Sequence, residues 1–324
     1  METKIEVKNL SKNYGAIQAV NNVSFSVGDQ QVLGFLGPNG AGKTTVMKIL
    51  TGFHFPSEGT AVVDGFSVEE TPLEVKRRIG YLPENVPLYG DLTVNEYLSF
   101  AADARFIPKQ QRKTSIENSL EVCGLTGYRG RRIETLSKGY KQRTGLAQAI
   151  LHDPPILILD EPTTGLDPNQ IIEIRSLIKE LGKRKTVILS THIMQEVEAI
   201  CNQVLIINDG KIAALGKPEE IAGSMKGGDT WELILKGSNV DSIRNKLLLL
   251  GDIANANIEE AENGLVNASF FIPADRSSSG AGENIFDWAC EHNMKILEMN
   301  RKKLSIEDIF VKLTGTSNSE GVQQ

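Results

Sequence analysis

The residues best suited to chemistry stand near the N-terminus, where three glycines and a lysine come directly before a helix-like stretch. The segment Gly37–Thr44 (GPNGAGKT) fits the pattern G-x-x-x-x-G-K-[ST] and follows Gln31–Leu36, which has the character of a buried strand. Glycines let successive backbone N–H groups contact phosphate oxygens, and the next helix presents the positive end of its dipole. The segment therefore predicts a phosphate site rather than an ordinary glycine-rich turn.

Two side chains of this phosphate loop have assigned roles. Lys43 is expected to reach the β- and γ-phosphates of a nucleotide, and the Thr44 hydroxyl to ligate Mg²⁺. Kinases, GTPases and helicases share this pattern, so the loop alone does not decide what the bound phosphate drives. The predicted cofactor-binding residues here are Gly37, Pro38, Asn39, Gly40, Ala41, Gly42, Lys43, Thr44 and Thr45.

A second motif, Ile156–Glu161 (ILILDE), is an apolar strand that ends in two acids. An aspartate at the end of a buried strand can orient the Mg²⁺ shell, and a neighbouring glutamate can polarise the attacking water. We assign these roles to Asp160 and Glu161. Two solvated carboxylates that merely cap a strand are the alternative, but the phosphate loop upstream argues against it. Together the two motifs predict hydrolysis of a nucleoside triphosphate.

A third segment, Leu136–Arg143 (LSKGYKQR), is called the signature segment below, because it resembles the signature of the ATP-binding cassette (ABC) ATPases. It lies shortly before the Asp-Glu strand, as in that family, and the resemblance extends from Ile5 to Ile221. Other markers resemble the family's in the same order. These are Tyr14 for the aromatic residue that stacks on adenine, Thr163–Asp167 for the loop after the catalytic acids, and His192 for the switch histidine.

The resemblance implies an α/β fold of the P-loop NTPase type with ATP and Mg²⁺ as cofactors, and a catalytic set of Lys43, Glu161 and His192. In the family, the helix that begins in the signature segment is presented to the ATP of the other subunit. Ser137 and Gly139 are accordingly expected at the nucleotide of a partner, and Asp167, in the loop after the catalytic acids, is expected to be a further cofactor-binding residue. The implied assembly is a head-to-tail homodimer, or a heterodimer with a related cassette, that ATP closes and hydrolysis reopens.

Two departures from the commonest family pattern bear on function. Glu84 stands where many members have the glutamine that contacts Mg²⁺ and the attacking water and links the site to the membrane partner. A carboxylate can still meet the metal, so Glu84 joins Thr44 and Asp160 as a predicted metal ligand. Lys138 and Tyr140 replace the commoner Gly and Gln, and this form of the signature segment resembles the exporter-type cassettes of drug, sodium and gliding-motility systems.

Hydrophobic periodicity predicts a sheet interrupted by helices, and a parallel sheet is the simplest arrangement. We predict an ABC ATPase domain at 1–223 with an inserted helical subdomain at about 90–152. A linker at Ser224–Asp229 leads to a C-terminal accessory or regulatory α+β domain of split βαβ type at 229–315, with a flexible loop at Asp275–Gly282 and a flexible tail at 316–324. The expected strands of the first domain are Ile5–Lys8, Val23–Val27, Gln31–Leu36, Glu58–Val63, Arg78–Leu82, Ile156–Leu159, Thr186–Ser190 and Gln203–Asn208.

Composition bounds the partners. The 324-residue chain is 40% hydrophobic and has no apolar run of membrane-spanning length. Its net charge is −6, so no nucleic-acid partner is expected. We predict a cytoplasmic protein, peripheral on the cytoplasmic face of the cell membrane, that energises a separate transmembrane permease subunit. A soluble ABC ATPase acting on ribosomes or DNA is the alternative, although such proteins usually carry two cassettes or a long coiled coil.

Overall fold

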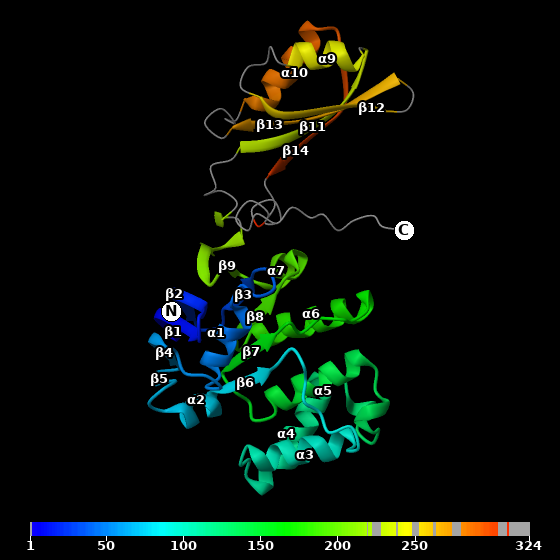
Figure 1. The fold of residues 1–324 in the computed structure, drawn as a ribbon. Helices are drawn as coiled ribbons and strands as arrows, with labels where there is room; N and C mark the ends of the chain where they lie inside the picture. Colours follow the sequence, from blue (N-terminus) through cyan, green and yellow to red (C-terminus); the bar gives the residue numbers. More distant parts are fainter. Residues whose placement is uncertain are drawn as a thin grey trace. The chain divides into compact units, whose positions relative to one another are not determined.

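The computed structural model describes residues 2–218, 220–221, 228–237, 239–247, 253–261, 264–273, 280–303 and 310 (Figure 1). The chain divides into two units, Met1–Pro218 and Glu219–Gln324, each with a hydrophobic core of its own. Most of the predicted linker, most of the predicted loop after residue 274 and the predicted tail lie outside the described residues.

The first unit is built on a six-stranded sheet in the order β10-β9-β3-β8-β7-β6. Its pairs are parallel, except that β10 runs antiparallel to β9. Every residue of β3, β7 and β8 is buried, which explains their continuous apolar runs, because both faces of the sheet are covered. The strands are β3 (Val32–Leu36), β6 (Ile79–Leu82), β7 (Ile156–Asp160), β8 (Thr186–Thr191), β9 (Gln203–Asn208) and β10 (Lys211–Gly216).

Four strands, two of them at the start of the chain, form a second, antiparallel sheet in the order β2-β1-β4-β5, so the predicted parallel sheet does not include all the expected strands of this unit. The reason is local: only Gly15 and Ala16 separate β1 from β2, and a two-residue connection permits antiparallel pairing alone. Gly15 has a positive φ of 59°, which such a tight turn requires. The strands are β1 (Thr3–Tyr14), β2 (Ile17–Gly28), β4 (Glu58–Val63) and β5 (Phe66–Ser67).

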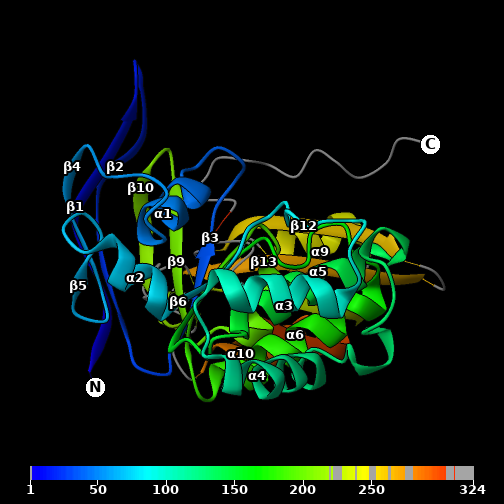
Figure 2. The ribbon, with the colours of Figure 1, turned by 90° about the horizontal axis from the view of Figure 1, so that it is seen from below.

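Helices complete the first unit. The inserted helical block, α3 to α5, gathers on the side of the central sheet away from the antiparallel sheet (Figure 2). Its first helix starts in a capping box, in which Thr93 and Glu96 satisfy each other's backbone N–H groups. The helices are α1 (Lys43–Leu50), α2 (Pro72–Arg78), α3 (Val94–Ala104), α4 (Lys109–Val122), α5 (Lys138–Ile150), α6 (Pro168–Gly182) and α7 (Met194–Ile200), with short 3₁₀ turns at η1 (Thr126–Tyr128) and η2 (Ile133–Thr135).

The second unit has an antiparallel sheet in the order β12-β13-β11-β14, and its elements follow the β-α-β-β-α-β order that the predicted split βαβ type implies. Two predicted loop segments are shorter in the structure than in the prediction. Gly228 and Asp229 belong to β11, because they pair with the end of β13, and Gly282 belongs to α10, where the Trp231 ring packs against it. The elements are β11 (Gly228–Lys236), α9 (Val240–Leu247), β12 (Ala254–Ala261), β13 (Leu265–Pro273), α10 (Ala281–Glu291) and β14 (Lys295–Lys303).

We predict that a histidine in the first unit makes the free energy of unfolding sensitive to acid. Burial lowers the pKa of His152, just after α5, to about 4, and the nearby Arg105 guanidinium acts in the same direction. The unfolded chain takes up this proton near pH 6.5, so the free energy of unfolding should fall as the pH drops from about 6.5 toward 4, by roughly 1–2 kcal/mol after allowance for partial exposure. Denaturant unfolding at several pH values should show a flatter dependence for His152→Asn; equal slopes would contradict the prediction.

Candidate functional site

The phosphate loop connects the end of β3 to the start of α1, and close packing explains two of its glycines. A Cβ on Gly37 would lie 2.5 Å from the Ile207 carbonyl oxygen, and one on Gly42 would lie 2.6 Å from that of Ala19. Gly42 also caps α1 with a φ of 106°, in the left-handed region that other residues avoid. The loop therefore fits between neighbouring strands only with glycine at these positions.

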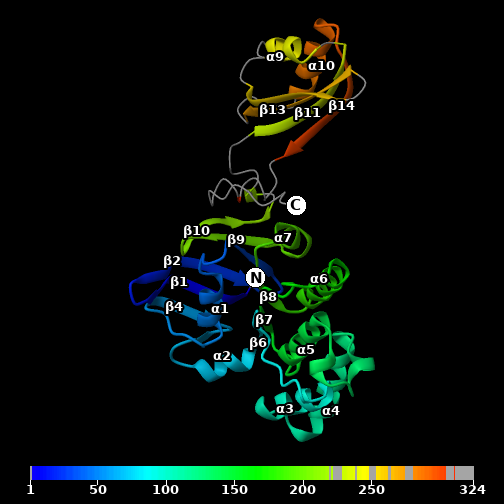
Figure 3. The same cartoon turned by 45° about the vertical axis from the view of Figure 1, so that its right-hand side comes forward.

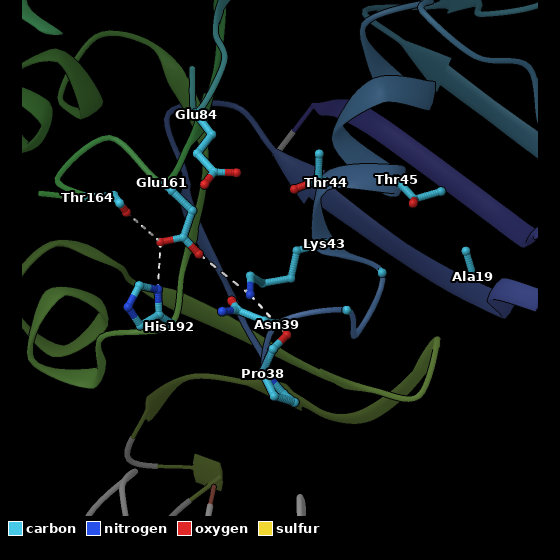
Figure 4. Close-up of a pocket in the computed structure, with 12 residues that line it drawn as sticks. Ala19, Pro38, Asn39, Lys43, Thr44, Thr45, Glu84, Glu161, Thr164 and His192 are labelled. Atoms are coloured by element: carbon cyan, nitrogen blue, oxygen red, sulfur yellow. Dashed lines mark hydrogen bonds and ion pairs between the residues drawn. The ribbon is translucent and has the colours of Figure 1, made fainter. Parts of the chain in front are cut away.

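A pocket of about 350 Å³ opens above this loop (Figure 4). It brings together residues from three strand ends and the loop, as expected where parallel strands end at one edge of a sheet. The pocket is lined by Ala19, Pro38, Asn39, Gly40, Gly42, Lys43, Thr44, Thr45, Glu84, Glu161, Thr164 and His192.

Lys43 is held deep in the pocket. Its side chain is 6% exposed, and its Nζ donates hydrogen bonds to the carbonyl oxygens of Gly37 at 2.6 Å and Pro38 at 3.2 Å. The same nitrogen lies 3.6 Å from Glu161 Oε1 (Figure 4). Its positive charge is thus fixed directly over the loop, where it can bind phosphate oxygens.

Glu161 follows β7 in a left-handed conformation, with φ 49°. Such a backbone is uncommon for a residue other than glycine, and strain of this kind is often stored at functional sites. The carboxylate is buried; its Oε2 accepts a 3.2 Å hydrogen bond from Thr164 and lies 2.8 Å from His192 Nδ1. His192 reaches it because β8, which ends just before His192, pairs with β7. The glutamate is therefore positioned from two sides, between a lysine and a histidine.

Side chains whose oxygens can ligate a metal ion lie beside Glu161. Asp160, the last residue of β7, is 1% exposed, and its Oδ1 accepts hydrogen bonds from Ser190 and, at 3.4 Å, from Thr44. Glu84 enters the pocket from the segment after β6. Among the described residues, no three His, Cys, Asp or Glu side chains are grouped closely enough to hold a metal by themselves. A hydroxyl and one or two carboxylates suit Mg²⁺, which takes further ligands from phosphates and water.

Several predicted site residues, among them Ser137, Gly139 and Asp167, do not line the pocket. Ser137 caps α5 by accepting a hydrogen bond from the Tyr140 N–H, and Gly139 lies in the first turn of the same helix. Asp167 caps α6, and its side chain accepts a 2.9 Å hydrogen bond from the N–H of Gln170. These three residues stand at the starts of helices, with no part in lining the pocket.

Tyr14 lies at the end of the β1-β2 hairpin and is 42% exposed. Its ring and that of His54 make a T-shaped contact, with centroids 5.8 Å apart, and Lys12 Nζ lies 5.3 Å from the Tyr14 ring centroid. Gly37 and Ala41 of the phosphate loop also do not line the pocket, since Gly37 packs under β9 and Ala41 is buried. Tyr14 is not among the residues that line the pocket.

Three residues of the site were not predicted: Ala19, Thr164 and Ser190. Thr164 and Ser190 fix Glu161, through its carboxylate and its backbone N–H respectively. Thr164 belongs to Thr163–Asp167, the segment that resembles the loop after the catalytic acids, and Ser190 lies two residues before His192, so both stand in or beside segments that the resemblance marks. Ala19 could not be found in this way, because it comes from the antiparallel sheet.

Comparisons with known proteins agree with this geometry. Residues 20–164 match the family model described as "ABC transporter". The uncharacterised ABC transporter ATP-binding protein YxlF of Bacillus subtilis is 33% identical over 95% of this chain and 99% of its own length. The Nod factor export ATP-binding protein I of Ralstonia nicotianae is 31% identical over 96% of this chain and 94% of its own length.

A solved structure extends the comparison to three dimensions. The dimeric structure of MJ0796, a bacterial ABC transporter cassette, matches 66% of this chain and 98% of its own length with a TM-score of 0.61 at 25% identity. With a phosphate loop, Glu84, Glu161 and His192 in one pocket, and relatives that match along nearly their full length, the chain belongs to the ATP-hydrolysing ATP-binding proteins of the ABC transporter family.

Proposed function

We propose that this chain is the ATPase subunit of an exporter, working as a dimer with a second copy or a related cassette and energising a separate membrane-spanning subunit. One observation carries the proposal: the pocket holds Lys43, Glu161 and His192 but not Ser137 or Gly139, which lie on another helix. A second cassette can supply that half from outside, and the dimeric MJ0796 structure supports this arrangement. The name of the Nod factor relative supports export.

At each nucleotide, the phosphate loop and Lys43 would bind the triphosphate, and Tyr14 would stack on the adenine. Thr44, Asp160 and Glu84 would hold Mg²⁺, which neutralises charge on the β- and γ-phosphate oxygens when bound. From the partner, Ser137 and Gly139 would contact the same ATP with the positive end of α5, while Asp167 would lie at the interface.

Hydrolysis in this proposal depends on Glu161 and His192. The carboxylate orients a water molecule and accepts a proton from it as the water attacks the γ-phosphate and the bond from that phosphorus to the oxygen of the departing ADP breaks. The imidazole holds the glutamate and the phosphate in position. The described contacts from Thr164 and Ser190 fix Glu161 before the reaction, so little reorganisation is needed.

The route to the membrane would begin at Glu84. Five residues beyond it, Tyr89 is 53% exposed and meets the ring of Phe100, itself 51% exposed, with centroids 5.5 Å apart. One segment thus joins the pocket to an exposed aromatic pair, which suits a contact with a membrane subunit at the cytoplasmic face. Among the described residues, no helix has the length and apolar character to cross a bilayer. The second unit would serve as an accessory or regulatory domain.

This route makes a prediction. The double variant Tyr89→Ala/Phe100→Ala should lose its association with native membranes while keeping the basal ATPase rate of the isolated chain, because neither side chain lines the pocket. Co-sedimentation of the full chain with washed membranes measures the association. Phe106→Ala is the matched control, because Phe106 is another aromatic residue of the helical block and is 86% exposed. Equal retention of the double variant and wild type would contradict the proposed contact.

A further inference from the structure

Glu196, in α7, is a carboxylate that the surface does not reach and the pocket does not include. It is 0% exposed. Its Oε2 accepts a 2.7 Å hydrogen bond from the Thr191 hydroxyl, and its Oε1 lies 3.4 Å from Arg175 Nη2. A charge buried in this way is costly unless its partners compensate it, and such groups are often kept for a specific structural or functional constraint.

The first partner of Glu196 leads to His192. Thr191 immediately precedes the histidine, and its Oγ1 also accepts a 3.0 Å hydrogen bond from the backbone N–H of Ile193, which immediately follows. Thr191 is itself fully buried, whereas the His192 side chain is 47% exposed. Packing therefore does little to fix the imidazole, and the backbone on both sides of it is fixed by Thr191 and Glu196.

The second partner of Glu196 is Arg175, which belongs to α6, and α6 lies between α5 and α7 (Figure 3). Arg175 reaches from α6 to Glu196, while Glu173, two residues earlier, pairs with Arg143 of α5. Residues two apart on an α-helix are about 200° apart around its axis, so these contacts lie on opposite sides of α6. The helix that carries the signature segment is thus connected through α6 to the segment that carries His192.

We propose that Glu196 is a positioning residue for ATP hydrolysis, which holds His192 against Glu161 through Thr191 and is itself anchored by Arg175. The proposal rests on the role proposed above for His192. A shift of α6 would move Arg175, and with it the Glu196 carboxylate, which holds His192 in position. The 2.8 Å contact between His192 Nδ1 and Glu161 Oε2 is the geometry that this network maintains.

Two variants test it in the full chain. Glu196→Gln keeps the acceptor but loses the charge paired with Arg175, and Thr191→Val removes the hydroxyl at nearly constant volume. Each should lower kcat about tenfold to hundredfold, because a small misplacement of a catalytic group is enough for such a loss. The dissociation constant for ATP should change less than about twofold. Thr191→Ser, which retains the hydroxyl, should keep kcat close to the wild-type value. Glu198→Gln, at an exposed position on the same helix, is the matched control and should match wild type.

Combination with His192→Ala separates this proposal from the proposed function. If Glu196 acts through the histidine, adding Glu196→Gln to His192→Ala should cause no further loss. A His192→Ala chain with the wild-type rate would refute the role of the histidine itself. A slow His192→Ala chain combined with wild-type rates for Glu196→Gln and Thr191→Val would refute the positioning role alone. Additive losses in the double variant would also refute it.

A spectroscopic measurement covers variants whose activity is too low to compare. The chain has 4 histidines, so their imidazole NMR signals can be assigned by substituting each in turn. Thr191→Val and Glu196→Gln should shift or broaden the His192 signal while leaving that of His292, in the other unit, in place. An unchanged His192 signal in both variants would overturn the proposal. Loss of all four native signals would indicate unfolding of Glu196→Gln, and Thr191→Val would then decide.

Discussion

Glu161→Gln is expected to abolish ATP turnover while ATP still binds, and to leave the protein as a stable dimer in the presence of ATP. The amide can still accept the hydrogen bond from Thr164, but it cannot take a proton from water, and general bases of this kind typically contribute about 10²–10⁴-fold to the rate. Size-exclusion chromatography with and without ATP, beside a phosphate-release assay, measures both effects. An ATP-loaded monomer that hydrolyses at the wild-type rate would refute the assignment of Glu161.

The same variant tests whether the two halves of the site come from different subunits. Ser137→Arg should be inactive alone, because the arginine blocks the start of α5. Mixed with Glu161→Gln, it should form heterodimers in which one site is intact. Random mixing makes half of the dimers mixed, so about a quarter of the wild-type rate should return. No recovery, although the mixed dimer forms, would indicate that Ser137 acts within its own subunit.

Lys43→Met is expected to weaken ATP binding itself. Lys43 is buried beside the loop carbonyl oxygens, and losing its charge-assisted hydrogen bonds to phosphate should cost about 3 kcal/mol, or about a hundredfold in affinity. Titration with a fluorescent ATP analogue measures the change.

Lys48→Met, on the same helix but outside the pocket, is the matched control and should bind ATP as wild type does. Thermal unfolding should accompany both titrations, because Lys43→Met also leaves the buried Glu161 carboxylate with one ionic partner fewer. Unchanged ATP affinity in a folded Lys43→Met chain would refute its role at the phosphates.

The sequence was enough to place the central strands and the residues at their ends. β4 and β9 have the predicted bounds, and β7 is longer than predicted by Asp160 alone. Lys43, Glu161 and His192 meet in one pocket for a reason visible in the sequence: each follows a buried apolar strand, and parallel strands end at one edge. The roles of these residues remain predictions for the experiments above.

Other features depend on contacts that no local pattern reveals. The alternation in β1 indicates a half-buried strand but not its partners, and β1 pairs with β4, which places Lys8 opposite Thr60. β10 has alternating intermediate and exposed residues and lies at the edge of the sheet, so its apolar pattern is weak. The burial of Glu196 was also invisible, because a glutamate early in a short helix is normally solvated.

The separate core of the second unit gives the protein a built-in optical reporter. Both tryptophans of the chain, Trp231 on β11 and Trp288 on α10, are buried in that core. Tryptophan emission therefore observes the second unit, even in experiments on the whole chain, because the first unit contains tyrosine but no tryptophan. A change of emission upon ATP binding would report that the nucleotide, held by residues of one unit, is sensed by the other.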